Sequence, residues 1–422
     1  MQVIFKSITK TMESFIKIIF LLSVVIGCSE ESTSPPKDDF KIVEYDPVSV
    51  PKTNQTKIYM HYMPWFSSPE ENGSWGIHWT MANRNPDIID SDGKREIASH
   101  FYPLIGPYSS TDKDVIEYHL LLMKLCGIDG VLIDWYGSFD VYDFGQNLVN
   151  SEALIDRLDE TGLDFGIVYE EYTCESVAKQ NKSETPIQAA KADLLYMANN
   201  YFSNSNYITI DGTPLLLTFG PRFFKKESDW TQIFEDINPK PVFLTLMNQS
   251  GDAGINADGE FAWVIRSYLM ELSFFYSSRA VSFKSSMSAA FPGFYDFYSE
   301  GGWSDHHLNW DINYNGTSTL STTLRQAEQS GLEMLQLVTW NDFGEGTMLE
   351  PTLEFGYTFL ETIQQFAGVS YNKNDLEMIF RLYKYRKQFA NDEERQLKLD
   401  QVFYYLVSLH IEEAGNLLDE IE

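Results

Sequence analysis

MLQLVTWNDFGEGTMLEP, residues 334–351, is the most informative stretch in this chain of 422 residues. Its apolar run ends at Trp340 and Asn341, and two carboxylates, Asp342 and Glu345, follow three residues apart. Cleavage of a glycosidic bond requires two such acids, one that donates a proton and one that acts as base or nucleophile. An acid pair alone is equally expected in a solvated turn or at a helix N-terminus, so the context of the stretch decides.

The same kind of apolar run occurs seven more times upstream, with helix-like patterns between the runs. Most runs are continuous rather than alternating, which is typical of strands covered on both faces. The eight runs are Lys57–Phe66, Gly130–Tyr136, Phe165–Tyr172, Pro214–Phe219, Val242–Met247, Phe261–Ile265, Val281–Ala289 and Met334–Trp340. Helical spacing of apolar residues is found within 113–126, 149–161, 184–203 and 317–330.

Eight strand–helix repeats over residues 55–370 predict an α/β fold, a (β/α)8 TIM barrel with long loops. A doubly wound open sheet is the alternative, but no glycine-rich phosphate fingerprint follows any of the runs. Beyond the barrel, residues 371–422 carry apolar side chains at helical spacing, such as Leu376, Ile379 and Leu382. We expect a C-terminal helical extension packed on the barrel rather than a hairpin that binds a partner.

The N-terminus has the features of a secretory signal. Lys6 and Lys10 precede an apolar stretch, 15–26, that is shorter than a typical membrane span. Cys28 follows a glycine directly after this stretch, which resembles a bacterial lipobox. We therefore expect residues 1–27 to be a lipoprotein signal peptide and Cys28 to be the lipidated first residue.

The segment after this cysteine predicts where the protein is located. Residues 29–31, Ser-Glu-Glu, resemble the surface-export signal of Bacteroidetes lipoproteins. Residues 28–54 are rich in Ser, Pro, Lys, Asp and Thr and are expected to form a flexible tether. The predicted location is the outer membrane, with the chain exposed at the cell surface and attached through its lipid only. Other outer-membrane proteins of glycan uptake are the candidate partners.

Composition narrows the class of protein further. A content of 43% hydrophobic and 15% aromatic residues supports a large packed core. The net charge of −30 repels phosphate backbones, so nucleic acid is not an expected partner. Neither Cys126 nor Cys174 has metal-type spacing, and His306-His307 has no carboxylate partner at ligand spacing. No metal and no cofactor are therefore predicted.

Four of the predicted strands end in aromatic side chains mixed with acids or amides. In a barrel these C-terminal ends meet at one face, where active sites lie. Sugar rings stack on aromatic side chains and offer hydroxyls to carboxylates and amides, so we predict a glycan-binding site there. Its predicted members, besides Asp342 and Glu345, are His61, Tyr62, Trp65, Asp134, Trp135, Tyr136, Glu170, Tyr172, Trp340 and Asn341.

Single members of this site have alternative interpretations. Core packing is the alternative for each tryptophan, and a structural role at the strand end is the alternative for Asp134. Glu170 is followed by Glu171, and strand geometry directs one of these side chains toward the barrel axis and the other away. Four further tryptophans are expected on loops above the site, namely Trp75, Trp79, Trp303 and Trp310.

These motifs resemble those of glycoside hydrolase families 99 and 71. Family 99, endo-acting α-mannosidases and α-mannanases, carries Asn-Glu-Trp-His-Glu-Gly-Thr followed by an aliphatic residue, Glu and Pro; residues 341–351 read NDFGEGTMLEP. Family 71, α-1,3-glucanases, carries Trp-Asn-Asp-Tyr-Gly-Glu-Ser, which is similar to residues 340–345. The Ile-Glu-Pro-Tyr motif of family 99 is similar to residues 169–172, YEEY. The resemblance spans roughly residues 55–370.

The resemblance implies that Glu345 is the general acid and that Asp342 is the base, which in family 99 deprotonates the 2-hydroxyl of the substrate. Asp342 replaces a Glu of the family motif, so its carboxylate is withdrawn by about 1.5 Å and a water gains room. A wider carboxyl separation favours inversion, so retention and inversion both stay open. Gly344 replaces the His of the motif, which leaves the sugar specificity open as well.

The leading hypothesis is a surface lipoprotein that hydrolyses an α-linked polysaccharide of the mannan or glucan type, by endo action with two carboxylates. The alternative is a non-catalytic glycan-binding lipoprotein on the same barrel. A glycan-synthesis enzyme is disfavoured, because a secretion signal separates it from cytosolic sugar nucleotides.

Overall fold

Eight parallel strands close into a barrel in the computed structural model, which describes residues 40–421. The strands are β1 (Lys57–Tyr62), β2 (Gly130–Trp135), β3 (Asp164–Tyr169), β5 (Thr213–Thr218), β6 (Val242–Leu246), β7 (Gly259–Phe261), β8 (Ser285–Ala290) and β9 (Met334–Leu337). Hydrogen bonding runs in the order β3-β2-β1-β9-β8-β7-β6-β5, and a parallel β3–β5 pairing closes the ring. The two-residue strand β4 (Thr209–Ile210) pairs only with β5, in antiparallel orientation. The predicted (β/α)8 barrel is confirmed.

Each of the eight apolar runs contains a barrel strand, but two runs are displaced from it. The run Phe261–Ile265 overlaps β7 only at Phe261, because Trp263 and Val264 line a cavity beyond the strand end. The run Val281–Ala289 begins before β8, because residues 280–282 form a 3-10 turn. In both places apolar character arises from packing outside the sheet.

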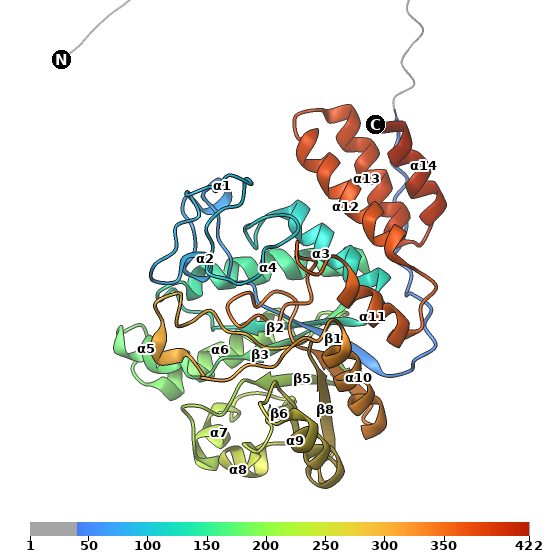
Figure 1. The fold of residues 1–422 in the computed structure, drawn as a ribbon. Coiled ribbons are helices and arrows are strands. Elements are labelled where there is room, and N and C mark those ends of the chain that lie inside the picture. Colours follow the sequence, from blue (N-terminus) through green and yellow to red (C-terminus); the bar gives the residue numbers. More distant parts are fainter. Residues whose placement is uncertain (1–39, 422) are drawn as a thin grey trace, which may run out of the picture. The chain divides into compact units, whose positions relative to one another are not determined.

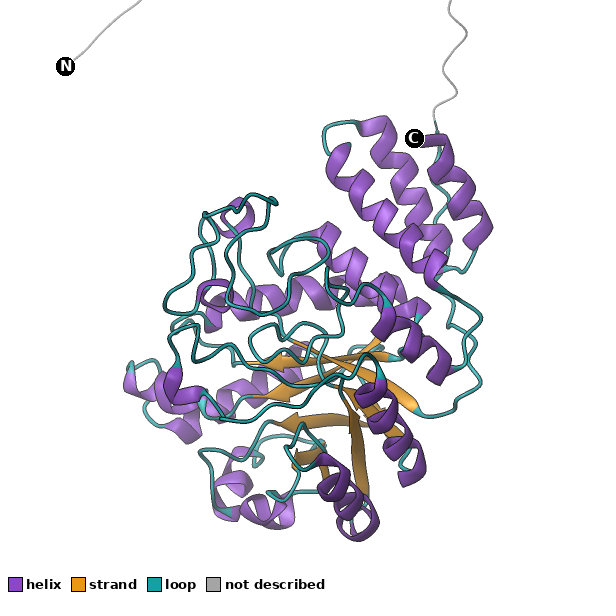
Figure 2. Cartoon of the chain, viewed as in Figure 1, coloured by secondary structure: helices purple, strands orange, loops and turns teal. Residues whose placement is uncertain are grey.

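Helices surround the strands, as Figure 2 shows. The four helices expected from spacing are found as α3 (Lys113–Leu125), α4 (Phe144–Thr161), α6 (Pro186–Asn200) and α10 (Ser318–Ser330). The other helices of the barrel and its loops are α1 (Pro69–Asn72), α2 (Ile77–Thr80), α5 (Thr173–Lys179), α7 (Glu227–Ile233), α8 (Ser250–Ala253), α9 (Tyr268–Phe274) and α11 (Thr358–Ala367).

Local signals explain where the main helices begin and end. The Asp112 side chain accepts hydrogen bonds from two backbone N–H groups in the first turn of α3, and Thr185 caps α6 in the same way, ahead of Pro186. Gly162 ends α4 with a φ of 69°, a conformation that glycine adopts without strain. These caps place the long helices between consecutive strands, as a barrel requires.

Three further helices follow the barrel and lie beside α3 in Figure 1. They are α12 (Lys373–Gln388), α13 (Glu393–Val407) and α14 (Ile411–Ile421). α12 packs on α3, and the guanidinium of Arg386 pairs with the buried carboxylate of Glu117 on α3 at 3.1 Å. Apolar side chains at helical spacing therefore predicted the C-terminal helices correctly, and these helices cover the barrel.

The tether expected over residues 28–54 is wrong for residues 41–54. The backbone N–H of Val43 donates to Gln401 on α13, and that of Val48 donates to the Val407 carbonyl. Side chains of the segment also hold it, since Lys52 pairs with Asp129 and the ring of Tyr45 packs against Tyr405. These partners are distant in sequence, so the composition of the segment did not predict this attachment.

Cys28 and the predicted signal peptide lie outside the described residues. Within residues 40–421, no helix combines the length and the apolar character that crossing a bilayer demands.

Candidate active site

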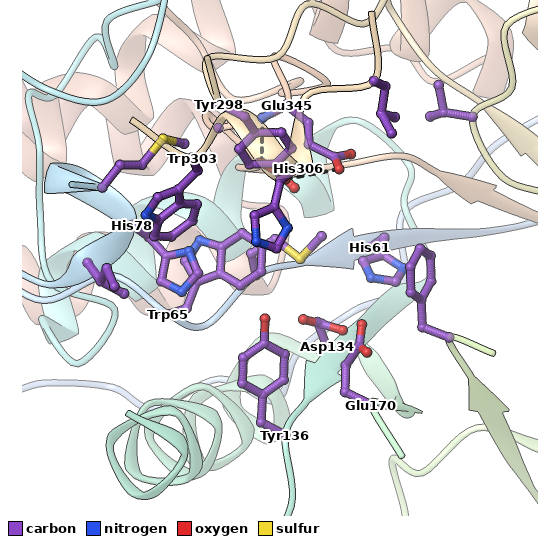
Figure 3. A pocket seen from close by; sticks show the side chains of 18 of the residues that line it. His61, Trp65, His78, Asp134, Tyr136, Glu170, Tyr298, Trp303, His306 and Glu345 are labelled. Atoms are coloured by element: carbon purple, nitrogen blue, oxygen red, sulfur yellow. Dashed lines mark hydrogen bonds between the residues drawn. The ribbon is translucent and has the colours of Figure 1, made fainter. Parts of the chain in front are cut away.

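A cavity of about 760 Å³ opens at the C-terminal ends of the barrel strands. Strand ends form its floor, and two long loops form much of its wall, one between β1 and α3 and one between β8 and α10. Figure 3 shows carboxylates, histidines and aromatic rings converging in this space. The volume lies within the range of small-ligand sites in proteins.

Most of the predicted site residues line this cavity. They are His61, Trp65, Asp134, Tyr136, Glu170, Tyr172, Asp342 and Glu345. They come from the ends of four strands that are distant in sequence, β1, β2, β3 and β9, and the closed barrel brings them together.

Two predicted aromatic residues of the site face away from the cavity. Trp135 is 1% exposed and packs among tyrosines on the outer side of the sheet, with the ring of Tyr169 at 5.9 Å. The hydroxyl of Tyr62 pairs with Nδ1 of His119 on α3 at 3.1 Å. Successive side chains of a strand point to opposite sides, so a strand end that directs Asp134 inward must direct Trp135 outward.

The predictions for Trp340 and Asn341 are also corrected. Trp340 is fully buried against His119, with ring centroids 5.2 Å apart. Asn341 accepts a hydrogen bond from the backbone N–H of Met63 at 2.9 Å and donates one to its carbonyl at 3.0 Å. Its amide therefore joins the ends of β1 and β9, and both residues shape the floor of the site without lining it.

The loop tryptophans divide in the same way. Trp303 and Trp310 line the cavity, as expected. Trp79 is fully buried and donates to the Tyr108 carbonyl, and Trp75 donates to Asp87. Trp75 and Trp79 therefore make hydrogen bonds within the loop between β1 and α3 and do not line the cavity.

Asp342 and Glu345 stand on one tight turn after β9. Oδ1 of Asp342 accepts the backbone N–H of Glu345 at 2.8 Å, and the Asp342 N–H donates to the Thr339 hydroxyl at 2.8 Å. The turn is joined to the β8 loop, because the Phe297 N–H donates to the Gly344 carbonyl at 2.8 Å. The two carboxylates are thus fixed by backbone geometry.

Burial raises the pKa of both carboxyls of this pair, and the groups around each carboxyl differ. It raises the pKa of Asp342 to about 7, while backbone N–H groups of Glu345 and Gly344 act in the opposite direction. It raises the pKa of Glu345 to about 8, aided by the charge of Asp342 and opposed by the hydroxyl of Tyr298. Each carboxyl therefore holds its proton to a higher pH than a solvated acid does, and backbone N–H groups stabilise the anion of Asp342.

A second carboxyl pair, Asp134 and Glu170, lies on the opposite wall (Figure 3). Burial and the charge of Asp342 raise the pKa of Asp134 to about 8. Burial and the neighbouring Asp134 carboxyl raise the pKa of Glu170 well above its usual range. This pair holds at least one proton at neutral pH, so it can donate as well as accept hydrogen bonds.

The adjacent acids Glu170 and Glu171 separate as strand geometry predicts. Glu171 points away from the cavity, where its carboxylate accepts the backbone N–H groups of Phe223 at 2.9 Å and Phe224 at 3.2 Å. These bonds fix the loop after β5, which carries Arg222 to within 3.7 Å of Glu170. Arg222 was not predicted, because it follows its strand by four residues and lacks any periodic signal.

Other cavity residues missed from the sequence come from loops. The ring of His78 stacks on Trp65 with centroids 4.0 Å apart, and Trp310 stacks on Phe294 at 4.4 Å. Tyr298 donates to Glu345 at 3.1 Å. Only the high aromatic content of the loops signals their role. The result is a cleft with flat apolar faces around four carboxyl groups, which suits a carbohydrate chain.

Comparison with known proteins agrees with this geometry. A family model described as glycosyl hydrolase family 99 matches residues 53–240. A glycoprotein endo-alpha-1,2-mannosidase of Xenopus laevis is 22% identical over 299 residues, covering 67% of this chain and 59% of that protein. A human glycoprotein endo-alpha-1,2-mannosidase-like protein is 20% identical over 328 residues, covering 70% and 68%. The chain thus spans 59% of the length of the Xenopus protein.

Solved structures show the same fold. The family 99 endo-alpha-mannosidase from Bacteroides thetaiotaomicron superimposes with a TM-score of 0.57 at 17% identity, covering 74% of this chain and 96% of that one. The barrel with an acid-lined aromatic cavity at its strand ends is thus similar in fold to this glycoside hydrolase. The matching family model and the relatives show that its sequence resembles that of glycoside hydrolase family 99, most directly over residues 53–240.

Proposed function

We propose that the chain hydrolyses an α-mannosidic bond within a glycan, with Glu345 as proton donor and Asp342 as proton acceptor. The observation that carries this proposal is the carboxyl pair on the β9 turn, in which Asp342 is buried, Glu345 is half-buried and the two have different hydrogen-bond partners. The class of substrate is supported by the α-mannosidase names of the relatives and by the aromatic walls of the cavity.

The geometry supports a specific sequence of proton transfers. Glu345 gives its proton to the leaving glycosidic oxygen, and the carboxylate that forms accepts the Tyr298 hydroxyl hydrogen. Asp342, stabilised as an anion by backbone N–H groups, takes a proton from the attacking nucleophile, which is a water or the substrate's own hydroxyl. Exclusion of bulk water from the cavity strengthens both interactions.

A panel of α-mannans and α-glucans, with products identified by mass spectrometry, tests this function. Glu345→Gln and Asp342→Asn should each lower turnover by about 10²–10⁴-fold while folding is unchanged. Glu328→Gln, which alters an exposed carboxylate on α10, is the matched control. Full activity in either site variant would refute the assigned roles, and binding without product release would identify a glycan-binding protein instead.

We further propose that the chain is a lipoprotein of the outer membrane, exposed at the cell surface. The support is the sequence alone: Lys6 and Lys10, the apolar stretch and the glycine before Cys28. Metabolic labelling with a radioactive fatty acid should mark the wild-type protein and leave Cys28→Ser unlabelled. Equal labelling of both proteins would exclude the anchor without affecting the catalytic proposal.

A further inference from the structure

His61 carries the most informative unsatisfied group in the cavity. Its side chain lines the cavity and is 1% exposed, and Nε2 is without a hydrogen-bond partner within the described residues. A buried ring nitrogen in this position costs free energy unless a ligand satisfies it. Because His61 lines the cavity, a molecule bound there can supply this partner.

The other ring nitrogen fixes which hydrogen-bonding role Nε2 has. Nδ1 of His61 lies 3.3 Å from Oε1 of Gln336, a fully buried residue of β9. The amide group of Gln336 is itself oriented, because its Nε2 donates to the Ala262 carbonyl at 2.5 Å. Gln336 thus presents an oxygen, which can only accept, so Nδ1 must carry the hydrogen of a neutral ring.

A neutral ring with hydrogen on Nδ1 has a lone pair on Nε2. Burial supports this state, since it lowers the pKa of His61 to about 4. The ring is also held in place by an edge contact with Trp263, with centroids 4.7 Å apart. Glu170, a residue 6% exposed, also lines this part of the cavity, and its only ion-pair partner among the described residues is Arg222, at 3.7 Å from Oε2. Figure 3 shows His61, Asp134 and Glu170 near one another.

We propose that Gln336 locks His61 as a hydrogen-bond acceptor and that a hydroxyl of the bound sugar donates to its Nε2. His61 is thereby a specificity-determining residue, and Gln336 is a positioning residue that acts through it. This inference rests on the proposed function and deepens it: the sugar bound here must carry a free hydroxyl at this position. A sugar with a deoxy or methoxy group there cannot donate and is selected against.

The first experiment measures the tautomer directly. In histidine-labelled protein, two-bond ¹H–¹⁵N correlations should show His61 with a protonated Nδ1 and an unprotonated Nε2 at neutral pH, and His61→Asn assigns the signal. Gln336→Met should abolish this preference. Gln364→Met, which removes a buried amide that donates to the Leu125 carbonyl, should leave it intact. A protonated Nε2 in the wild-type protein would overturn the proposal.

The second experiment measures the contact with the sugar. Glu345→Gln is used as the background because it prevents turnover. Binding of α-1,2-mannobiose and its monodeoxy analogues is compared in Glu345→Gln and in Glu345→Gln/His61→Phe. In Glu345→Gln, one analogue should bind about tenfold more weakly than α-1,2-mannobiose. In Glu345→Gln/His61→Phe, that analogue and α-1,2-mannobiose should bind with equal affinity. Analogue losses that are the same in both proteins would overturn the hydroxyl contact.

These two experiments also separate failure of the inference from failure of the proposed function. If no α-mannoside or α-glucoside binds, the proposed function and the sugar contact are both refuted, whereas the tautomer measurement still decides the role of Gln336. If His61→Phe unfolds, Gln336→Met provides the comparison instead, with the same expected loss of discrimination.

Discussion

Tyr298, on the loop after β8, donates its hydroxyl hydrogen to Oε1 of Glu345 across 3.1 Å. The bond joins the wall of the cavity to the residue proposed as the proton donor. Because it stabilises the ionised form of Glu345, it lowers the pKa of that carboxyl against the effect of burial. The tyrosine is thus arranged to act on the carboxylate that forms during the reaction.

Tyr298→Phe should lower kcat about tenfold and move the alkaline limb of the pH–rate profile to higher pH. The first effect follows from loss of a hydrogen bond to the charged product state, and the second from the higher pKa of Glu345. Tyr295→Phe, three residues away and stacked on His100, is the control. An alkaline limb that stays in place or moves to lower pH would contradict this role.

The pH dependence of the wild-type protein follows from the two pKa values on the β9 turn. Asp342 must be ionised to accept a proton, so activity should fall as the pH drops below about 7. Glu345 must be protonated to donate, so activity should also fall as the pH rises above about 8. We expect a narrow bell in kcat/KM between these limits, measured at constant ionic strength. A plateau that extends well below pH 6 would show that burial does not raise the pKa of Asp342 in this way.

The tryptophans of the site make a prediction that separates binding from stability. Trp65 lines the cavity and stacks on His78. Trp65→Ala should therefore raise KM about tenfold, with little change in the unfolding midpoint. Trp340, fully buried behind the site, should instead lose about 3–5 kcal/mol of unfolding free energy as alanine. Thermal unfolding and steady-state kinetics of both variants test this. A higher KM with unchanged stability in Trp340→Ala would show that Trp340 contacts the substrate.

The strand ends could be located from sequence because apolar runs, stopped by polar residues, mark a buried strand directly. Side chains of a strand alternate between its two sides, so only one of two neighbours can face the cavity, as Asp134 and Trp135 show. Choosing between them requires the register of the barrel. That register depends on the pairing of β2 with β1 and β3, which no local pattern reveals.

The loop residues could not be predicted for a different physical reason. Arg222 is placed by Glu171, which binds backbone N–H groups across 51 to 53 positions of sequence. Tyr298 is placed by the bond between the Phe297 N–H and the Gly344 carbonyl. Such contacts use backbone atoms, so they carry no residue-specific signal in either loop.

A last prediction concerns how the C-terminal helices are held on the barrel. Glu117 of α3 is buried and pairs with two arginines, Arg386 of α12 at 3.1 Å and Arg157 of α4 at 2.7 Å. Glu117→Ala removes the buried partner of both arginines and leaves Arg386 with Asp400 and Arg157 with Glu160. It should therefore lower the unfolding free energy by about 1–3 kcal/mol. Denaturant unfolding measures this loss.

The control for this change is Asp419→Ala, which removes an exposed partner of Arg381 and should cost less than about 1 kcal/mol. Specific activity per folded molecule should be unchanged in both variants, because neither carboxylate lines the cavity. Since Arg157 also lies over the ring of Phe403 on α13, loss of Glu117 releases two of the three C-terminal helices together. We therefore expect protease cleavage near residues 370–373 to increase in Glu117→Ala before the barrel unfolds. If the barrel and the helices unfold in a single step with unchanged stability, this ion-pair cluster does not hold the helices in place.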